Sequence, residues 1–248
     1  MQALFFDCDG VLADTERDGH RLAFNQAFAQ AGLAAEWSVE RYADLLRTTG
    51  GKERMARDFD ETGWPADVPI ADRDALIAGL HQSKTRLFAD IVEGGRMPLR
   101  PGVARLIDEA LGAGMKVAVC STSNEMSVRA ILRQLGPERV PLIAVFTGDI
   151  VAKKKPDPAI YRLAAETLGL DPAQCVVIED SNNGLRAALA AGMVCIVTTS
   201  SFTGDEDFTG AARVVTDLGD DPRIQVSLAD CRACADAAVG DRVQEPPD

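Results

Sequence analysis

The 248-residue chain contains no hydrophobic run that approaches the roughly 20 apolar residues of a membrane-spanning helix. It also has no excess of basic residues, because 26 lysines and arginines stand against 38 aspartates and glutamates, for a net charge of −12. Nucleic acids and anionic membrane surfaces select the opposite balance. We therefore expect neither a nucleic-acid partner nor a membrane partner, and an anionic ligand would need a metal ion or a local cluster of cations.

The six cysteines do not have the spacing of a disulfide framework, and most of them lie in apolar runs, where cysteine behaves as a small hydrophobic residue. Cysteines placed in this way favour a reducing compartment for the protein. Cys231 and Cys234 form a C-x-x-C pair, which we interpret as two thiols on one helix face rather than as a redox centre. The first predicted strand begins at Ala3, so we expect no signal or transit segment within this sequence.

Short apolar runs rich in Val, Ile and Phe recur along the chain, and helical patterns separate them. Their apolarity is continuous rather than alternating, which is typical of parallel strands that helices cover on both faces. The sequence therefore predicts an α/β fold with a Rossmann-like parallel sheet, whose ligands bind at the carboxyl ends of the strands. The predicted strands are Ala3–Phe6, Lys116–Cys120, Leu142–Phe146, Cys175–Ile178, Val194–Val197 and Arg213–Val215.

The interval between the first two predicted strands is far longer than a single crossover requires. Asp14 and Thr15 are expected to cap a helix at its start, and further helical patterns follow at 38–46, 51–59 and 72–91. We predict that residues 14–96 form an inserted small α-helical cap domain, and that residues 1–13 and 97–248 form the α/β core.

Two carboxylates follow the first predicted strand, in the segment Asp7-Cys8-Asp9-Gly10. Gly10 permits a sharp reversal of the chain, so both carboxylates are expected at the carboxyl end of the strand. One can act as a nucleophile and the other as a general acid/base, provided that a divalent metal ion offsets their repulsion. Alone this pattern is weak, because turns favour Asp and Gly for structural reasons.

Other strand ends supply the remaining groups that phosphoryl transfer needs. Ser121 and Thr122 offer hydroxyl and backbone donors to phosphate oxygens, and Lys155 offers a cation. Glu179 and Asp180 offer hard oxygen ligands for Mg²⁺. Each group has an ordinary alternative as a helix cap, a solvated charge run or a helix start. Their shared place at one edge of the sheet favours a phosphoryl-transfer site.

With these four motifs in order, nearly the whole chain resembles the haloacid dehalogenase superfamily of phosphotransferases. The resemblance implies that Asp7 is the nucleophile and Asp9 the acid/base. It further implies that Ser121 and Lys155 hold the phosphate. The three consecutive lysines at 153–155 leave open which one reaches the phosphate, although Lys155 matches the family by the proline that follows it.

The same resemblance implies a Mg²⁺ ion on Asp7, on the backbone carbonyl of Asp9 and on Asp180, with Glu179 close by. Asp9 would have to carry a proton when the reaction starts. The neighbouring carboxylate raises the pKa of Asp9 and the metal ion lowers it, so the sequence leaves its protonation state open.

The helical segment resembles the family's small cap, which contacts the non-reacting end of the substrate. Gly50 and Gly51 expose backbone N–H groups beside the cations Lys52 and Arg54, which predicts a site for a second phosphate. The alternative is an ordinary loop followed by the start of a helix. His20 lies one helical turn after Glu16, and both are candidate contacts to sugar hydroxyls, although a lone histidine is more often structural. The candidate substrate-binding residues here are Glu16, His20, Tyr42, Gly50, Gly51, Lys52 and Arg54.

The segments 14–20, 48–54, 119–124 and 153–161 resemble the CbbY-like branch, particularly its chloroplast members in plants and algae. This resemblance implies an enzyme of the chloroplast stroma that uses Mg²⁺ to hydrolyse xylulose 1,5-bisphosphate, a Rubisco inhibitor, to xylulose 5-phosphate. We expect a monomer. A bacterial cytoplasm is the alternative compartment. The residues themselves predict only a Mg²⁺-dependent phosphomonoesterase for a small sugar bisphosphate. A β-phosphoglucomutase-type mutase and a general sugar-phosphate phosphatase remain alternatives.

Overall fold

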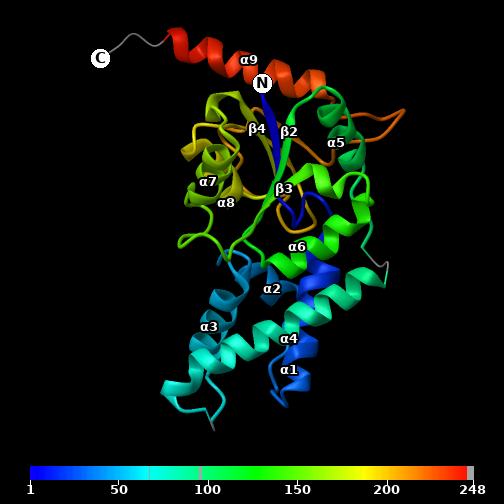
Figure 1. The fold of residues 1–248 in the computed structure, drawn as a ribbon. Coiled ribbons are helices and arrows are strands. Elements are labelled where there is room, and N and C mark those ends of the chain that lie inside the picture. Colours follow the sequence, from blue (N-terminus) through cyan, green and yellow to red (C-terminus); the bar gives the residue numbers. More distant parts are fainter. Residues whose placement is uncertain (67, 95–96, 245–248) are drawn as a thin grey trace.

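The computed structural model describes residues 1–66, 68–94 and 97–244. Its six strands form one parallel sheet in the order β3-β2-β1-β4-β5-β6 (Figure 1). The predicted parallel α/β fold is therefore confirmed. The strands are β1 (Ala3–Phe6), β2 (Lys116–Cys120), β3 (Ile143–Phe146), β4 (Cys175–Glu179), β5 (Val194–Thr198) and β6 (Arg213–Val215).

Alternate residues of the central strands pack into two different apolar cores. Leu4 and Phe6 of β1 join the core on one face, which α5 (Val103–Gly112), α6 (Glu125–Leu132) and α9 (Leu228–Gln244) cover. Phe5 joins the core on the other face, which α7 (Ala159–Leu168) and α8 (Asn182–Ala190) cover. Both faces of the central strands are buried, which explains why their sequences are continuously apolar.

The described helices include nine α-helices and several shorter turns. Those beside the sheet are α5 (Val103–Gly112), α6 (Glu125–Leu132), α7 (Ala159–Leu168), α8 (Asn182–Ala190) and α9 (Leu228–Gln244). No helix within the described ranges is both long and apolar enough to cross a membrane. The short helical turns are Glu16–His20, Ile70–Asp72, Arg133–Leu135, Val140–Leu142 and Pro172–Gln174.

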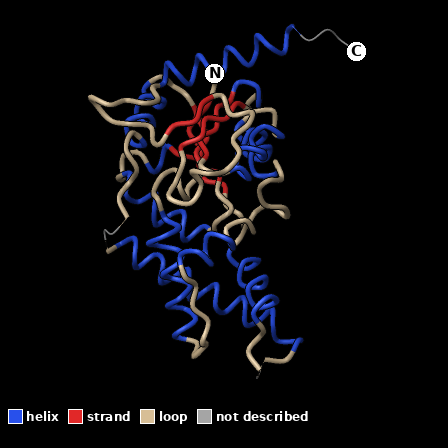
Figure 2. The backbone as a smooth tube through the Cα atoms, turned by 180° about the vertical axis from the view of Figure 1, so that it is seen from behind, coloured by secondary structure: helices blue, strands red, loops and turns tan. Residues whose placement is uncertain are grey.

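The four remaining helices lie together beyond the carboxyl ends of the strands, as Figures 1 and 2 show from opposite sides. They pack around an apolar cluster in which Phe24, Phe28 and Trp37 are fully buried, while Phe88 and Ile91 near the end of the last of these helices join the first core of the sheet. The predicted division at 14–96 stays a prediction, and residues 95–96 at its end lie outside the described residues. These helices are α1 (Arg21–Gln30), α2 (Val39–Leu45), α3 (Gly51–Thr62) and α4 (Arg73–Glu93).

The predicted capping role of Asp14 and Thr15 is wrong. The chain enters α1 through a π-helical turn at Glu16–His20, and the Thr15 side chain makes no capping hydrogen bond there. Instead, the Asp14 carboxylate accepts hydrogen bonds from the backbone N–H and the hydroxyl of Ser201, which follows β5. The Thr15 hydroxyl donates to Asp9. Tertiary partners have therefore replaced the local capping interaction.

Candidate active site

The candidate site lies at the carboxyl ends of the central strands. Strand β1 pairs with β2 on one side and with β4 on the other, so the chain order reverses at β1. Open α/β sheets bind ligands at such a reversal, because the loops after neighbouring strands separate there. Asp7 follows β1, Ser121 follows β2 and Asp180 follows β4. The structure therefore brings together three motifs that lie far apart in the sequence.

Asp7 and Lys155 form a buried ion pair at the base of this site. The Lys155 Nζ atom lies 2.6 Å from an Asp7 oxygen and 2.6 Å from a Glu179 oxygen. It also donates to the carbonyl of Cys120 at 2.8 Å, so three acceptors surround one ammonium group. The Tyr161 hydroxyl donates to the same Glu179 oxygen. These contacts hold the lysine and both carboxylates in one arrangement.

The three consecutive lysines of this loop have different exposures and different partners. Lys155 is 5% exposed and faces Asp7, whereas Lys153 is 78% exposed and lies 3.9 Å from Asp157. Lys154 points instead toward the helices and pairs with Glu53. Of the three, only Lys155 contacts the predicted nucleophile. The geometry therefore supports Lys155, the lysine that the following proline favours, as the one that reaches the phosphate.

The carboxylates around Asp7 are suited to hold a divalent cation. Oxygen atoms of Asp7, Glu179 and Asp180 all lie within 4.8 Å of one another, and all three residues are buried. Burial, opposed by Lys155 and reinforced by the charges of Glu179 and Asp9, raises the pKa of Asp7 to about 8. Burial and the charges of Asp7 and Glu179 also raise the pKa of Asp180 well above its usual value. The negative charge of these three carboxylates therefore needs more positive charge nearby than Lys155 alone supplies.

Gly10 lets the first loop lie directly against Asp180. Its φ of +80° falls in the left-handed region, which residues with a side chain rarely adopt. A Cβ atom on Gly10 would lie 2.0 Å from an Asp180 oxygen. The glycine thus serves two purposes, because it permits the reversal of the chain and leaves space for a carboxylate from β4.

Asp9 is held in a different environment from Asp7. The Thr15 hydroxyl lies 2.6 Å from Asp9 Oδ1, His20 Nε2 lies 2.7 Å from the same atom, and the Ser123 hydroxyl donates to Oδ2. Burial alone would raise the pKa of Asp9, but His20 and these hydrogen bonds outweigh it and place the pKa far below its usual value. Asp9 is therefore ionised in this arrangement.

A lysine from α4 completes this environment. Lys84 Nζ lies 2.7 Å from His20 Nδ1, and since an ammonium group only donates, His20 presents its other nitrogen to Asp9 as a donor. The ring of Phe88 stacks on the His20 imidazole with a centroid distance of 3.8 Å. Burial lowers the pKa of Lys84 to about 8. Helix α4 thus contributes to the environment of the predicted acid/base.

The sequence did not reveal Thr15, Lys84 or Ser123 as parts of the site. Ser123 lies two residues after Ser121, so its place in the same loop was the available signal. Thr15 had an apparent local role as a helix cap. No local pattern marks Lys84, because it reaches His20 across 64 residues of sequence.

We expect Lys84→Met to change stability and activity in opposite directions. The folded-state pKa of about 8 lies below the ordinary 10.5, so the buried ammonium costs about 3 kcal/mol below pH 8, and this cost declines as pH rises toward 10.5. At pH 7 the variant should gain up to about that free energy of unfolding. Its kcat should fall about 10²-fold, because His20 loses its donor.

Urea unfolding and steady-state kinetics at pH 7 and pH 10 would measure both effects. Lys116→Met removes an exposed lysine and is the matched control. Loss of stability together with loss of activity would contradict the expectation, since it would indicate a purely structural role for Lys84.

Ser121 and Thr122, the predicted phosphate contacts after β2, differ in position. The Ser121 backbone N–H donates to the carbonyl of Phe146 at 3.0 Å, so it is not available to a ligand. Its buried hydroxyl accepts a hydrogen bond from the backbone N–H of Ser123. Thr122 and Ser123 line the open space above the carboxylates. Thr122 and Ser123 therefore line that space, whereas Ser121 does not.

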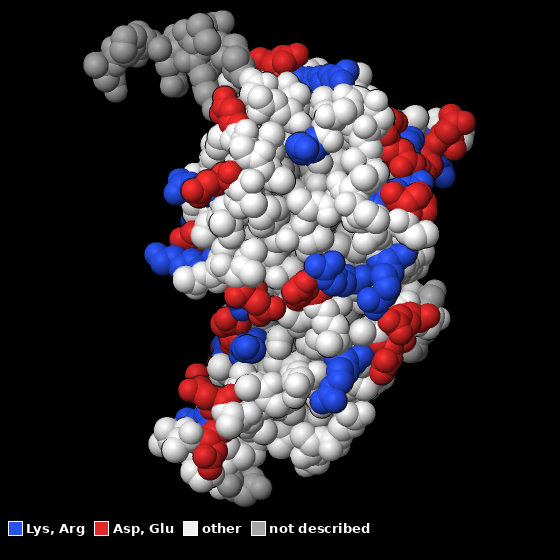
Figure 3. Space-filling view, viewed as in Figure 1, with Lys and Arg blue, Asp and Glu red and all other residues white. Residues whose placement is uncertain are grey.

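A cavity of about 610 Å³ lies between the strand ends and the helices. Figure 3 shows acidic and basic side chains gathered near this junction on one face of the molecule. Of the predicted site residues, only Ser121 and Tyr42 do not line the cavity. Those that do are Asp7, Asp9, Glu16, His20, Gly50, Gly51, Lys52, Arg54, Thr122, Lys155, Glu179 and Asp180.

The helices contribute a second polar group to the cavity wall. The buried Tyr42 hydroxyl donates to Glu16, and Arg54 lies 3.1 Å from the Tyr42 oxygen and 3.6 Å from a Glu16 oxygen. Arg54 also donates to the carbonyl of Thr48. Tyr42 therefore acts behind Glu16 and Arg54 rather than at the cavity surface.

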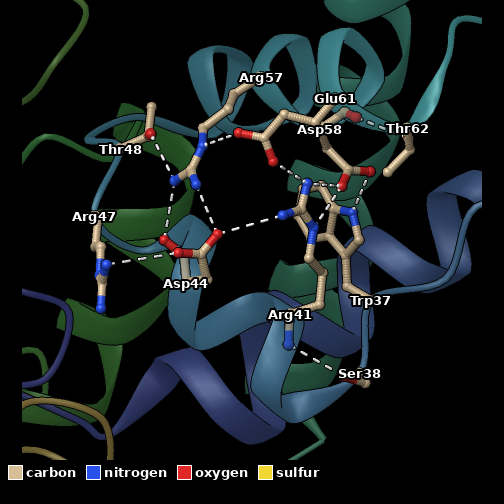
Figure 4. Close-up of polar contacts among 10 residues, drawn as sticks. All are labelled: Trp37, Ser38, Arg41, Asp44, Arg47, Thr48, Arg57, Asp58, Glu61 and Thr62. Atoms are coloured by element: carbon tan, nitrogen blue, oxygen red, sulfur yellow. Dashed lines mark hydrogen bonds and ion pairs between the residues drawn. The ribbon is translucent and has the colours of Figure 1, made fainter.

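The loop between α2 and α3 is held by a network of charged side chains, drawn in Figure 4. Arg57 donates to the carboxylate and the backbone carbonyl of Asp44 and also to the hydroxyl of Thr48. Arg41 donates twice to Asp58, which also accepts from the indole N–H of Trp37. These contacts fix the loop that carries Gly50 and Gly51 into the cavity.

Three lysines act on His81, which lies at the helical side of the cavity near Gly51. The ring of His81 lies close to this glycine, since a Cβ on Gly51 would be 3.1 Å from its Nε2 atom. Burial, together with the charges of Lys84, Lys52 and Lys154, lowers the pKa of His81 to about 3. This positive field favours an anionic ligand.

Comparisons with known proteins agree with this geometry. A family model for haloacid dehalogenase-like hydrolases matches residues 1–192. A CBBY-like protein of Arabidopsis thaliana is 57% identical over 232 residues, which cover 92% of this chain and 73% of that protein. The protein CbbY of Cereibacter sphaeroides is 45% identical over 218 residues, which cover 87% of this chain and 91% of that protein.

Solved structures include a close match to the whole arrangement. A variant of CbbY from Rhodobacter sphaeroides, in complex with xylulose-(1,5)bisphosphate, is 42% identical and has a TM-score of 0.83. The match covers 93% of this chain and 99% of that one. The family resemblance is thereby confirmed. On the extent of the family match and the identity to these relatives, the chain belongs to the haloacid dehalogenase-like hydrolases.

Proposed function

We propose that the protein is a phosphatase that converts xylulose 1,5-bisphosphate to xylulose 5-phosphate through an aspartyl phosphate. The observation that carries this proposal is the pair of carboxylates at the base of the cavity. Asp7 is paired with Lys155, whereas Asp9 accepts hydrogen bonds from donors on three sides. The two carboxylates thus have different environments, and Mg²⁺ beside Asp7 and a phosphate beside Asp9 would shift their pKa values in the directions that a nucleophile and an acid require. The substrate is the one held by the related CbbY.

In the first step, an oxygen of Asp7 attacks the phosphorus atom and the bond from phosphorus to the sugar oxygen breaks. Asp9 donates a proton to that oxygen as it leaves. Asp9 is ionised in the free protein, so it must first take up a proton from solvent as the substrate binds; the negative charge of the bound phosphate favours this uptake, because it disfavours the ionised carboxyl. Lys155 and the Thr122 loop offset the charge on the phosphoryl oxygens.

In the second step, water attacks the phosphorus atom of the aspartyl phosphate. Asp9, now ionised, accepts a proton from this water, and the bond between Asp7 and phosphorus breaks. Inorganic phosphate is released and the Asp7 carboxylate is restored. The hydrogen bonds from Thr15 and Ser123 favour the ionised form of Asp9 in this step.

Asp7 and Asp180 would hold Mg²⁺, together with the backbone carbonyl of Asp9. Glu179 lies within the same cluster but already accepts hydrogen bonds from Lys155 and Tyr161, so we place it behind the metal site. When bound, Mg²⁺ supplies positive charge that lowers the repulsion between the carboxylates and the phosphate.

The helices would recognise the rest of the substrate. Glu16 and His20 line the cavity beside Asp9 and would contact the sugar hydroxyls, with Tyr42 fixing Glu16 from behind. Gly50, Gly51, Lys52 and Arg54 line its helical wall and would hold the second phosphate. No side chain caps the start of α3 at Gly50.

We propose that this activity removes a Rubisco inhibitor, and that the protein works as a monomer in a chloroplast stroma or a bacterial cytoplasm. The relatives named above come from a plant and from bacteria. Either compartment is reducing, which fits cysteines that are free and, except for the half-buried Cys234, buried.

Phosphate release from xylulose 1,5-bisphosphate and from ribulose 1,5-bisphosphate, each with Mg²⁺ at low micromolar substrate, tests the proposal. We expect rapid release from the first and little from the second, because the cavity would distinguish the hydroxyl stereochemistry of the two sugars. Addition of EDTA should abolish release, and excess Mg²⁺ should restore it.

Equal release from both sugars would reduce the function to a general sugar-phosphate phosphatase. Conversion of glucose 1-phosphate to glucose 6-phosphate without net release of phosphate would indicate a mutase. Unchanged activity in EDTA would contradict the metal site formed by Asp7 and Asp180.

A further inference from the structure

An ion pair joins the loop that carries Lys155 to the first turn of α3. The Lys154 Nζ atom lies 2.8 Å and 3.0 Å from the two oxygens of Glu53, so the ammonium contacts both oxygen atoms of the carboxylate. The two residues are 101 positions apart in the sequence. Hydrogen bonding to Lys154 lowers the pKa of Glu53 against the effect of its partial burial. Glu53 is therefore ionised at neutral pH.

This ion pair lies at the wall of the substrate cavity, beside Gly50. Gly50 has a φ of +102°, and a Cβ at this position would lie 2.2 Å from a Glu53 oxygen and 2.6 Å from Lys154 Nζ. Lys154, Gly50 and Lys52 all line the cavity. A smaller cavity is lined by Glu53 as well as by Lys154 and Lys155, which also line the first. Lys154 thus borders both spaces, and Glu53 borders the smaller one.

The pair is too exposed to be an important source of stability. Side-chain exposure is 24% for Lys154 and 47% for Glu53, and ion pairs in such positions contribute little to the free energy of folding. By contrast, the pair formed by the adjacent Lys155 is almost fully buried. A dianionic phosphate group carries more charge than a carboxylate, so it can displace Glu53 from Lys154.

We propose that Glu53 is an internal anion that occupies Lys154 in the free enzyme, and that the second phosphate of the substrate replaces it. This inference rests on the proposed function and adds a determinant of its selectivity for bisphosphates. A substrate with one phosphate would leave the Glu53–Lys154 pair intact and gain nothing from Lys154. A bisphosphate would exchange one anion for another at that lysine, while Glu53 turns toward solvent.

The exchange predicts opposite effects for the two partners. Lys154→Gln should raise KM for xylulose 1,5-bisphosphate about tenfold, because a charge-assisted contact to phosphate is lost. Glu53→Gln should lower the same KM roughly threefold or more, because the competing anion is gone. Neither variant should change kcat/KM for p-nitrophenyl phosphate by more than about twofold, because that probe has no second phosphate.

The double variant supplies a second test. If Glu53 acts only through Lys154, the double variant should have the KM of Lys154→Gln alone. Lys153→Gln, from the same loop, and Asp60→Asn, from the same helix, make the same changes in charge at exposed positions that do not line the cavity and should leave KM unchanged.

Other results would overturn the exchange. If both single variants raise KM for both substrates, the pair merely holds the helices against the sheet domain. If neither variant changes KM for the bisphosphate, its second phosphate does not reach Lys154. Hydrolysis of p-nitrophenyl phosphate without hydrolysis of the bisphosphate would refute the proposed function instead. Inhibition by the bisphosphate would then still report on Lys154, through Ki values that the two variants should shift in opposite directions.

Discussion

Replacement of Asp7 by asparagine is expected to lower kcat by about 10⁴-fold or more, because the amide cannot attack phosphorus as a carboxylate does. The change is nearly isosteric, and Asp7 lies in a buried cluster that already carries excess negative charge. The variant should therefore fold and still bind the bisphosphate. Phosphate release and isothermal titration with xylulose 1,5-bisphosphate would measure the two properties separately.

Acid-quenched wild-type enzyme should also contain a phosphoryl group on the peptide that carries Asp7, as mass spectrometry would detect. Asp108→Asn is a suitable control, because Asp108 is an exposed carboxylate paired with Arg139 and distant in sequence from the motifs. Appreciable turnover by Asp7→Asn, or phosphorylation at another residue, would remove Asp7 as the nucleophile.

Lys155→Met is expected to have the largest effect on stability. The ammonium lies between Asp7 and Glu179 in a site with almost no exposure to solvent. Removal of one partner from a buried ion pair leaves uncompensated charge and costs about 3–5 kcal/mol. Activity should also fall about 10³-fold, because the phosphoryl oxygens lose a fixed positive charge. Thermal unfolding in EDTA, followed by kinetics with Mg²⁺, would measure both losses.

Mg²⁺ should restore part of the lost stability to Lys155→Met, because it would bind among the same carboxylates. The matched control is Lys153→Met, which removes an exposed lysine from the same loop. A variant of Lys155 as stable in EDTA as the wild type would show that this ion pair does not hold the site together.

Much of the sheet could be predicted from the sequence because strands and crossover helices leave local patterns. The continuous apolarity of β1, β4 and β5 follows from burial of both strand faces. The start of α2 was also predictable, since the Ser38 side chain accepts a hydrogen bond from the N–H of Arg41. Asp14 and Thr15 had the same capping signal, but their partners are Ser201 and Asp9. Local propensity was overridden there by contacts between distant segments.

The residues of the candidate site also differ in whether the sequence could predict them. Asp7, Asp9 and Asp180 follow predictable strand ends, so their meeting at one edge of the sheet follows from the parallel topology. The contact of Lys84 with His20 depends on the packing of α4 against the first helices, and no residue near Lys84 in the sequence signals it. The choice among three consecutive lysines was likewise decided by the direction in which the loop presents each one.

The sequence by itself determined the class of fold, the family and the residues around which the site is built, because strand periodicity and short motifs are local properties of the chain. Only the tertiary structure decided the pKa values of those residues. Burial and neighbouring acids raise the pKa of Asp7, whereas hydrogen bonds lower that of Asp9, two residues away. Electrostatic environment depends on which distant groups come within a few ångströms, and folding of the whole chain sets those distances.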